Sequence, residues 1–451
     1  MSPDELLTLA RRVVAQARPG EEIEVACSYG DSRSIRVYDS EVESLTSADN
    51  TGIGVRVLVD GREGFASAGS LDDDVVADML AEARDNAQFA EADPYVGIAR
   101  PDGVAAVDVD LWRDGVKAVS MDDKIALALE LERRVRAASP AVTGVRVAGY
   151  SDSEGAFALA STAGIEVATE ATSASVSVQA LAVDGARTQT GYAYDGARDP
   201  RELDLDKVVK RAVAHAVEMI GATKPATATV ELVLDPHLAA TVVGLVAGTL
   251  TGDRVLKGRS PFVNRVGELV ASPALTVVDD ATDPASLGAD SHDGEGLATR
   301  RVPLVIDGVL QGFLHDSYTG RRSGSGSTGS AVRGTRGLPA PGVHALHIDA
   351  GTAGDLEQLI AKTDLGVLVF SLAGLHSGVN AVSGDFSVGV EGRMIRQGKL
   401  AEPISECTVG STLQRLLLDI SAVGSDLTHL PNGVSTPSLK IGGVTLSGAS
   451  T

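Results

Sequence analysis

The stretch from Glu166 to Val183 reads EVATEATSASVSVQALAV, and apolar and polar residues alternate along most of it. A period of two over so long a stretch predicts an extended β-strand whose two faces meet different surroundings. The turn-forming pair Asp184-Gly185 follows, and the residues from Arg187 to Tyr194 come after it. We expect this second segment to pair with the long strand across the Asp-Gly turn as a β-hairpin. The chain must therefore form a sheet around at least one long hairpin.

Helices and shorter strands surround this hairpin. The first helix begins with a capping box at Ser2 and Glu5, and Pro19-Gly20 ends it. Residues 93–122 are irregular and acidic, and they can subdivide the N-terminal region. By the same patterns we expect strands at 21–28, 34–38, 41–48, 51–59, 64–68, 142–150 and 156–161, and helices at 72–89, 124–138 and 205–220.

The pair Lys224-Pro225 marks a predicted domain boundary. We expect residues 1–224 to form an N-terminal α/β region, and residues 225–451 to form a β-rich C-terminal domain. Glycine accounts for 50 of the 451 residues, a larger share than the ~7% that is usual in proteins. This excess favours many turns and close backbone approaches. The predicted fold class is therefore α+β.

A helix is expected to open the C-terminal domain. Asp235 can cap it, and Pro236 fits the first helical position. The residues that follow are apolar nearly all round, so we expect the helix to be buried and to end at Gly252-Asp253. Gly244 and Gly248 lie four apart on one face, where each costs roughly 1 kcal/mol relative to alanine. That cost predicts a close neighbour on this face, and a basic loop from Arg254 to Arg259 should follow.

The rest of the C-terminal domain reads as short strands with two further helices, at 355–362 and 412–419. Cys407 falls in one of the strands as a small core residue. The low-complexity segment from Ser323 to Ser330, SGSGSTGS, should be flexible. It lacks the lysine of a phosphate-binding loop, so it is expected either to line a cavity or to be a plain surface linker.

The charge balance limits the partners. Lys and Arg number 39 against 61 Asp and Glu, which leaves a net charge of −22. Such a surface repels nucleic acid and anionic membranes, and it also favours solubility. Cys27 and Cys407 are the only cysteines and suit a reducing cytoplasm. We find no signal peptide and no apolar run of membrane-spanning length, so a cytoplasmic protein is expected.

Six stretches of the C-terminal half, in order, resemble the TldD/TldE (PmbA) family. They are GDRVLKGRSPFVNRVGELVASPALTVVDD, HDGEGLATRRVPLVIDGVLQGFLHDSYTGRRSG, STGSAVR, VNAVSGDFSVGVEGRMI, SAVGSDL and PSLKIGGVTLSG. The resemblance covers roughly half the chain. It implies that this chain pairs with a related subunit, because the family pairs two types.

The resemblance also implies where zinc would bind. The TldD type carries H-E-x-x-x-H just before a Gly-Asp, with two histidine ligands and a glutamate base. Here that position holds Val243, Gly244 and Gly248, which offer no ligand atoms. The family's third ligand is a cysteine shortly after S-x-V-G-x-D-L, and no cysteine follows Asp426-Leu427. The chain therefore resembles the TldE (PmbA) type, with no catalytic residue and no metal in this chain and zinc in the partner.

The resemblance implies a function for the pair. In the family, the assembled subunits cleave unfolded or small peptides, and this chain would complete the enclosed chamber. Two alternatives remain open at the level of sequence. One is a metallopeptidase in its own right with a nonstandard site. The other is a regulatory binding protein, acting on gyrase or a toxin–antitoxin pair, without proteolysis.

Seven residues within the family-like stretches are candidates for lining the chamber or the subunit interface. They are Asp253, Arg259, Asp293, Glu295, Ser327, Thr328 and Asp385. Asp293, Glu295 and Asp385, with Asp279-Asp280, fit either a catalytic carboxylate pair or turn-stabilising side chains. The histidines fit either an unrecognised metal site, for example at His292 with Asp293 and Glu295, or ordinary hydrogen-bonded positions. His344 and His347 should face opposite ways if both lie on one strand.

Overall fold

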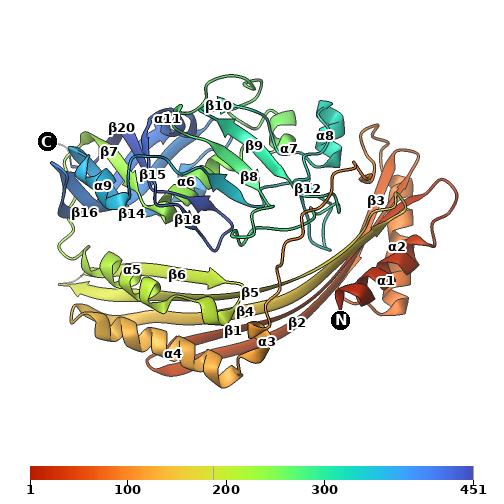
Figure 1. The fold of residues 1–451 in the computed structure, drawn as a ribbon, viewed down its shortest axis with the longest axis horizontal. Coiled ribbons are helices and arrows are strands. Elements are labelled where there is room, and N and C mark those ends of the chain that lie inside the picture. Colours follow the sequence, from red (N-terminus) through yellow and green to blue (C-terminus); the bar gives the residue numbers. More distant parts are fainter. Residues whose placement is uncertain (186, 450–451) are drawn as a thin grey trace.

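The computed structural model describes residues 1–185 and 187–449. Ala186 and the last two residues of the expected 225–451 domain therefore lie outside the described part. Figure 1 shows two halves: a strongly curved sheet of long strands, and a more compact half that lies against the concave side of that sheet. The mixture of helices and strands confirms the α+β class. No helix in the described part is long and apolar enough to cross a membrane.

The N-terminal sheet has the order β3-β2-β1-β4-β5-β6 and is antiparallel throughout. The predicted hairpin is confirmed as β5 and β6. Three expected pairs of short strands are wrong, because each pair forms one continuous strand. Gly30 and Gly155, which lie in the gaps between the expected short strands, face each other inside paired strands. The strands are β1 (Glu22–Tyr38), β2 (Glu41–Val59), β3 (Arg62–Ala68), β4 (Val142–Ser161), β5 (Glu166–Asp184) and β6 (Arg187–Ala197).

Helices cover the convex side of this sheet (Figure 1). The capping box of the first is confirmed, since the Ser2 hydroxyl accepts from the Glu5 N–H and the Glu5 carboxylate accepts from the Ser2 N–H. Each long helix buries an apolar stripe against the strands. The segment 93–122 runs beside the C-terminal half, where Val109 and Leu111 pack on Ala289. The helices are α1 (Pro3–Val14), α2 (Asp73–Phe89), α3 (Gly115–Ala118), α4 (Met121–Ala138), the short η1 (Pro200–Glu202) and α5 (Leu205–Val217).

The C-terminal half is built on two six-stranded sheets and a two-stranded ribbon. One sheet has the order β16-β15-β14-β7-β20-β17 and closes into a barrel through pairing of β16 with β20. The other has the order β10-β9-β8-β13-β19-β18, and β11 pairs with β12. The barrel strands are β7 (Ala228–Leu234), β14 (Leu365–Ala373), β15 (Asp385–Arg396), β16 (Lys399–Thr412), β17 (Ile420–Val423) and β20 (Leu439–Ser447). The other strands are β8 (Val277–Asp280), β9 (Arg301–Ile306), β10 (Val309–Leu310), β11 (Ala331–Val332), β12 (Ala340–Pro341), β13 (Leu346–Ile348), β18 (Thr428–His429) and β19 (Ser435–Thr436).

The buried helix is α6 (Pro236–Ala247), and it contacts β7, β14 and β19. Its expected cap is confirmed, because the Asp235 carboxylate accepts from the Leu238 N–H at 3.0 Å. It ends at Ala247, before the predicted end at Gly252-Asp253, and a short helix from Gly252 to Leu256 follows where we expected a basic loop. The helices of this half are α6, α7 (Gly252–Leu256), α8 (Ser317–Ser323), α9 (Leu356–Ala361), α10 (Leu375–Gly378) and α11 (Leu413–Leu418).

Candidate functional site at the boundary between the two halves

The position of the family's zinc motif lies on α6. Val243 is buried in the core of the C-terminal half. A Cβ added to Gly244 would meet no atom within 4 Å, and Gly248 is exposed at the end of the helix. The expected close neighbour on this face is therefore absent among the described residues. These three side chains carry no nitrogen, oxygen or sulfur, so zinc does not fit them.

The segment that would supply the third ligand does lie near α6, because β19 packs against that helix and pairs with β18. Its polar groups serve local structure. Asp426 accepts from the N–H and the hydroxyl of Ser438, at 3.0 and 2.6 Å. His429 Nδ1 lies 2.8 Å from the Ser435 hydroxyl. Within the described residues, no group of three His, Cys, Asp or Glu side chains could hold a metal ion.

Asp293 and Glu295 form a buried acidic turn. The Asp293 carboxylate accepts from the backbone N–H groups of Glu295, Leu297 and Ala331, at 2.9, 3.0 and 3.1 Å. Burial nevertheless raises the Asp293 pKa to about 6. These bonds match the turn-stabilising interpretation of this residue.

Glu295 has the more strongly raised pKa of the two carboxyl groups in this turn. One of its oxygens accepts from the Ser317 N–H at 2.8 Å, and the other has no partner in the described structure. Burial, and then the charge of Asp293, raise its pKa to about 8. Unpartnered buried carboxyls with raised pKa values are typical of functional sites, although structural networks produce them as well.

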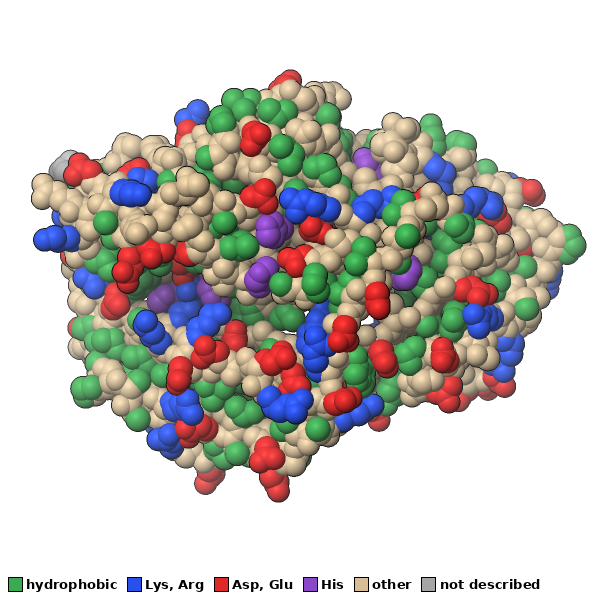
Figure 2. Space-filling view, viewed as in Figure 1, with side chains coloured by type: hydrophobic (Ala, Val, Ile, Leu, Met, Phe, Trp, Pro, Cys, Tyr) green, Lys and Arg blue, Asp and Glu red, His purple; other side chains and the backbone are tan. Residues whose placement is uncertain are grey.

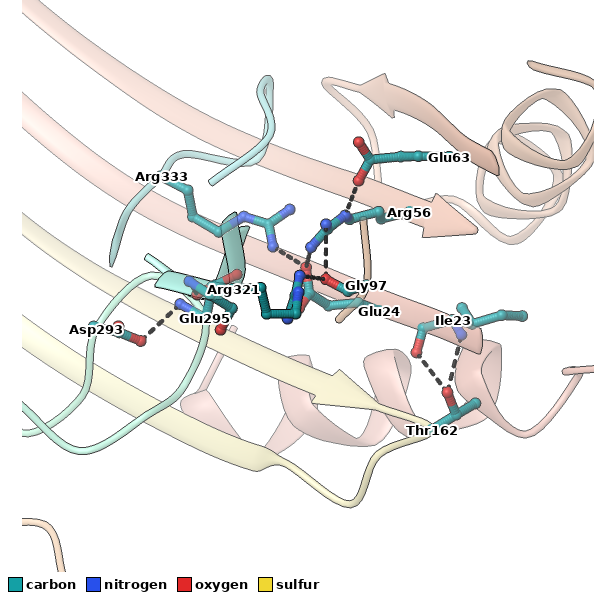
Figure 3. Close-up of polar contacts among 11 residues, drawn as sticks. Ile23, Glu24, Arg56, Glu63, Gly97, Thr162, Asp293, Glu295, Arg321 and Arg333 are labelled. Atoms are coloured by element: carbon teal, nitrogen blue, oxygen red, sulfur yellow. Dashed lines mark hydrogen bonds and ion pairs between the residues drawn. The ribbon is translucent and has the colours of Figure 1, made fainter. Parts of the chain in front are cut away.

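Around Glu295 lies a cluster of charged side chains that we call the charged clasp: Glu24, Arg56, Glu63, Glu295, Arg321 and Arg333 (Figure 3). Arg333, from the C-terminal half, pairs with Glu24 on β1, and both side chains are fully buried. Arg56 on β2 pairs with Glu63 and lies 3.5 Å from Glu24. The clasp therefore joins the two halves through buried opposite charges.

Arg321 links the clasp to the segment between α2 and α3. Its Nε donates to the Tyr95 carbonyl and its Nη2 to the Gly97 carbonyl, both at 2.7 Å. Arg56 donates to the same Gly97 carbonyl at 3.2 Å. Burial lowers the pKa of Arg321, and the charge of Glu295 opposes that change. Figure 3 shows Arg321 beside Glu295.

A cavity of about 310 Å³ adjoins the acidic turn, and Asp290, His292, Asp293 and His344 are among the residues that line it. His344 Nε2 lies 3.0 Å from the Ala331 carbonyl, whereas His292 Nδ1 is buried with no partner in the described structure. His347 points elsewhere, with its Nε2 3.4 Å from Asp349. Two histidines and two aspartates thus share one cavity.

Three further candidate residues, Ser327, Thr328 and Asp253, make local hydrogen bonds. The hydroxyl of Thr328 accepts from the His315 N–H at 2.8 Å, and the Ser327 hydroxyl lies 3.3 Å from the His315 carbonyl. The second half of the SGSGSTGS segment is therefore held against the residues that lead into α8. Asp253 lies in α7 and accepts from the Thr251 hydroxyl at 2.8 Å.

Arg259 and Asp385 stay outside this group. Arg259 is exposed after α7. Asp385 is exposed at the start of β15 and accepts from the Ser383 hydroxyl at 2.6 Å. Cys407 is buried in β16, and burial raises the pKa of its thiol to about 11. Cys407 is therefore a core residue, as predicted. The fold thus gathers Asp293, Glu295, Ser327 and Thr328 around α8, without Asp385.

Five of the six members of the clasp were missed by the sequence reasoning: Glu24, Arg56, Glu63, Arg321 and Arg333. Glu24 and Arg56 occupy polar positions of alternating strands, which are typical of a solvent-facing surface. The C-terminal half covers that surface, and the sequence pattern does not show what covers a strand.

Comparisons with known proteins agree with one another. Models of PmbA/TldA metallopeptidase domains match residues 23–87 (domain 1), 114–220 (central domain) and 227–448 (C-terminal domain). The chain belongs to the PmbA/TldD family.

Individual relatives cover most of the chain. The metalloprotease PmbA of Escherichia coli O157:H7 is 26% identical over 98% of this chain and 96% of its own. A TldD homologue from Buchnera aphidicola is 28% identical over 58% of this chain and 57% of its own. The crystal structure of TldE from Thermococcus kodakarensis has a TM-score of 0.88 and 23% identity, covering 99% of both chains. The last similarity establishes the fold of the PmbA/TldD chain described here.

Proposed function

We propose that this chain is the TldE-type subunit of a two-subunit zinc peptidase, paired with a TldD-type partner that holds the zinc. The observation that carries the proposal is the motif position on α6. Val243, Gly244 and Gly248 stand there, and none of these side chains can bind a metal or act as a base. No step of zinc chemistry is therefore assigned to this chain.

The role proposed for this chain is structural. Its clasp holds the C-terminal half against the concave sheet, and Asp293 fixes the turn that carries Glu295. The open face of α6 at Gly244 and Gly248 leaves the backbone uncovered, so an extended peptide or a partner segment can approach closely. The substrates expected for the pair are unfolded or small peptides.

Metal analysis of the two subunits tests the proposal. The purified chain, dialysed without chelator, should hold far less than one zinc per chain. A TldD-type partner from the same cell should hold about one and should copurify with this chain. Stoichiometric zinc that is lost on His292→Ala or His237→Ala would instead favour a peptidase with a nonstandard site.

A further inference from the structure

A second cleft, of about 340 Å³, lies between the halves at the edge strand β6. Tyr192, Tyr194, Arg211 and His215 line it from the N-terminal half, and His237 and Glu391 from the C-terminal half. Its volume is within the range of small-molecule sites. Figure 2 shows a hollow between the two halves, with histidine side chains in it.

The walls of this cleft are aromatic. The His215 ring stacks on Phe370, with centroids 4.5 Å apart and planes at 7°. Tyr194 meets His237 edge to face at 5.4 Å, and Tyr192 lies 5.9 Å from Tyr194. Tyr192 is 53% exposed, so part of its ring is free to contact a ligand. A flat, apolar group would bury well against these rings.

Polar groups in the cleft are left without protein partners. His237 Nδ1 is buried and has no hydrogen-bond partner among the described residues. In the described part of the chain, the side chains of His215, Tyr192 and Glu391 likewise show no hydrogen bond or ion pair. Burial, and then the charge of Arg211, lower the pKa of both histidines to about 4, so each neutral ring can donate and accept at pH 7. A buried nitrogen such as His237 Nδ1 is normally hydrogen-bonded, so its lack of a partner in the described structure favours a polar ligand here.

The cleft also offers two opposite charges from different halves. Arg211, on α5, pairs with Asp235 through Nη1 and keeps its other nitrogens for a further acceptor. Guanidinium groups bind carboxylates strongly. Glu391, on β15, is an exposed carboxylate that can bind an ammonium group, and the tyrosine rings that line the same cleft favour a cation as well.

We propose that this cleft binds a small zwitterion with an aromatic ring, namely a free aromatic amino acid or a dipeptide that contains one. The carboxylate would bind Arg211 with the two imidazoles, the ammonium would bind Glu391, and the ring would lie against Tyr192 and Tyr194. The site needs no partner subunit, so it goes beyond the function proposed above and does not depend on it.

Calorimetric titration of the chain alone tests the ligand chemistry. L-phenylalanine or L-phenylalanylglycine should bind. N-acetyl-L-phenylalanine, L-phenylalaninamide and L-alanine, which lack the ammonium, the carboxylate and the ring respectively, should each bind at least tenfold more weakly. No binding of either aromatic zwitterion at millimolar concentration would overturn the proposal, and so would equal binding of the capped compounds. Because no partner is present, neither result bears on assembly with a TldD-type subunit.

Two variants test the location. Tyr192→Ala and Glu391→Gln should each weaken binding at least tenfold, with unchanged thermal unfolding because both side chains are exposed. Tyr38→Ala is the matched control, since Tyr38 is also 53% exposed, and Glu357→Gln is the control for charge. The imidazole C–H resonances of His215 and His237 should shift on binding. Binding that survives both variants, or leaves both resonances unmoved, would place the ligand elsewhere and contradict the proposal.

Discussion

Arg333 and Glu24 form an ion pair that spans the two halves of the molecule, and neither side chain reaches solvent. They lie 309 residues apart in the chain. Arg333 Nε and Nη2 and one Glu24 oxygen have no further partner in the described structure. Glu24 also lies 3.5 Å from Arg56, whereas Arg333 has no other carboxylate partner in the described structure, so the charge of Arg333 depends on Glu24 for its compensation.

Removing one member of this pair should be costly. Glu24→Gln should lower the free energy of unfolding by about 3–5 kcal/mol, because the charge of Arg333 stays buried without a partner. Arg333→Met should cost less, because Glu24 keeps Arg56 at 3.5 Å. The double variant should be less destabilised than the two single losses added together. Urea unfolding measures all three. Arg11→Ala, which breaks the half-exposed pair with Glu166, should cost much less; an equal loss there would show that burial is not the cause.

Glu295 should make stability depend on pH. Its pKa is near 4.5 when unfolded and about 8 when folded, so the folded chain retains a proton that the unfolded chain has released. Stability should therefore fall as pH rises from about 4.5 to 8. Glu295→Gln should flatten this part of the profile, as measured by urea unfolding across the range. An unchanged slope in the variant would mean that Glu295 ionises normally in the folded state.

Replacing Gly244 of α6 by alanine should change stability in the opposite direction to replacing Gly191 of β6. Gly244→Ala meets no neighbour and should stabilise the lone chain by about 0.5–1 kcal/mol. In Gly191→Ala, the new Cβ would lie 2.0 Å from the Ala212 carbonyl of α5, so the variant should be destabilised. Thermal unfolding of the two variants compares them directly. A loss of stability in Gly244→Ala would show that something covers this face in the lone chain.

The two cleft histidines should resist protonation. Burial lowers the pKa of His215 and His237 to about 4, against an ordinary value near 6.5. As pH falls, His215 and His237 become protonated in the unfolded chain before they do in the folded chain. Stability should therefore decrease as pH falls from about 6.5 to 4. NMR titration of the imidazole protons in the free protein should show both rings neutral at pH 5.5. Midpoints near 6.5 would mean that water reaches both rings.

Much of the fold could be predicted from local patterns. The caps at Ser2 and Asp235 and the hairpin of β5 and β6 rest on interactions between neighbours in sequence. The long strands were divided wrongly, because Gly30 and Gly155 are held in extended form by strands on both sides. Pairing with distant strands outweighed their local preference for turns.

The site was less accessible to sequence reasoning. Asp293 and Glu295 could be singled out by their place in a family-like stretch, but their burial could not. The clasp depends on contact between residues about 300 positions apart, as with Glu24 and Arg333. The tight packing expected around Gly248 is contradicted, because this residue is exposed at the end of α6, where the lack of a side chain costs little.

The most direct test of the proposed division of labour is peptide cleavage by separated and mixed subunits. An unstructured peptide should stay intact with this chain alone, and it should be cleaved by the mixture with a TldD-type partner in a manner that a chelator abolishes. Changing the partner's motif histidines to alanine should remove cleavage, whereas His237→Ala, His292→Ala or His315→Ala in this chain should leave much of it. Chelator-sensitive cleavage by this chain alone, free of any partner, would contradict the account.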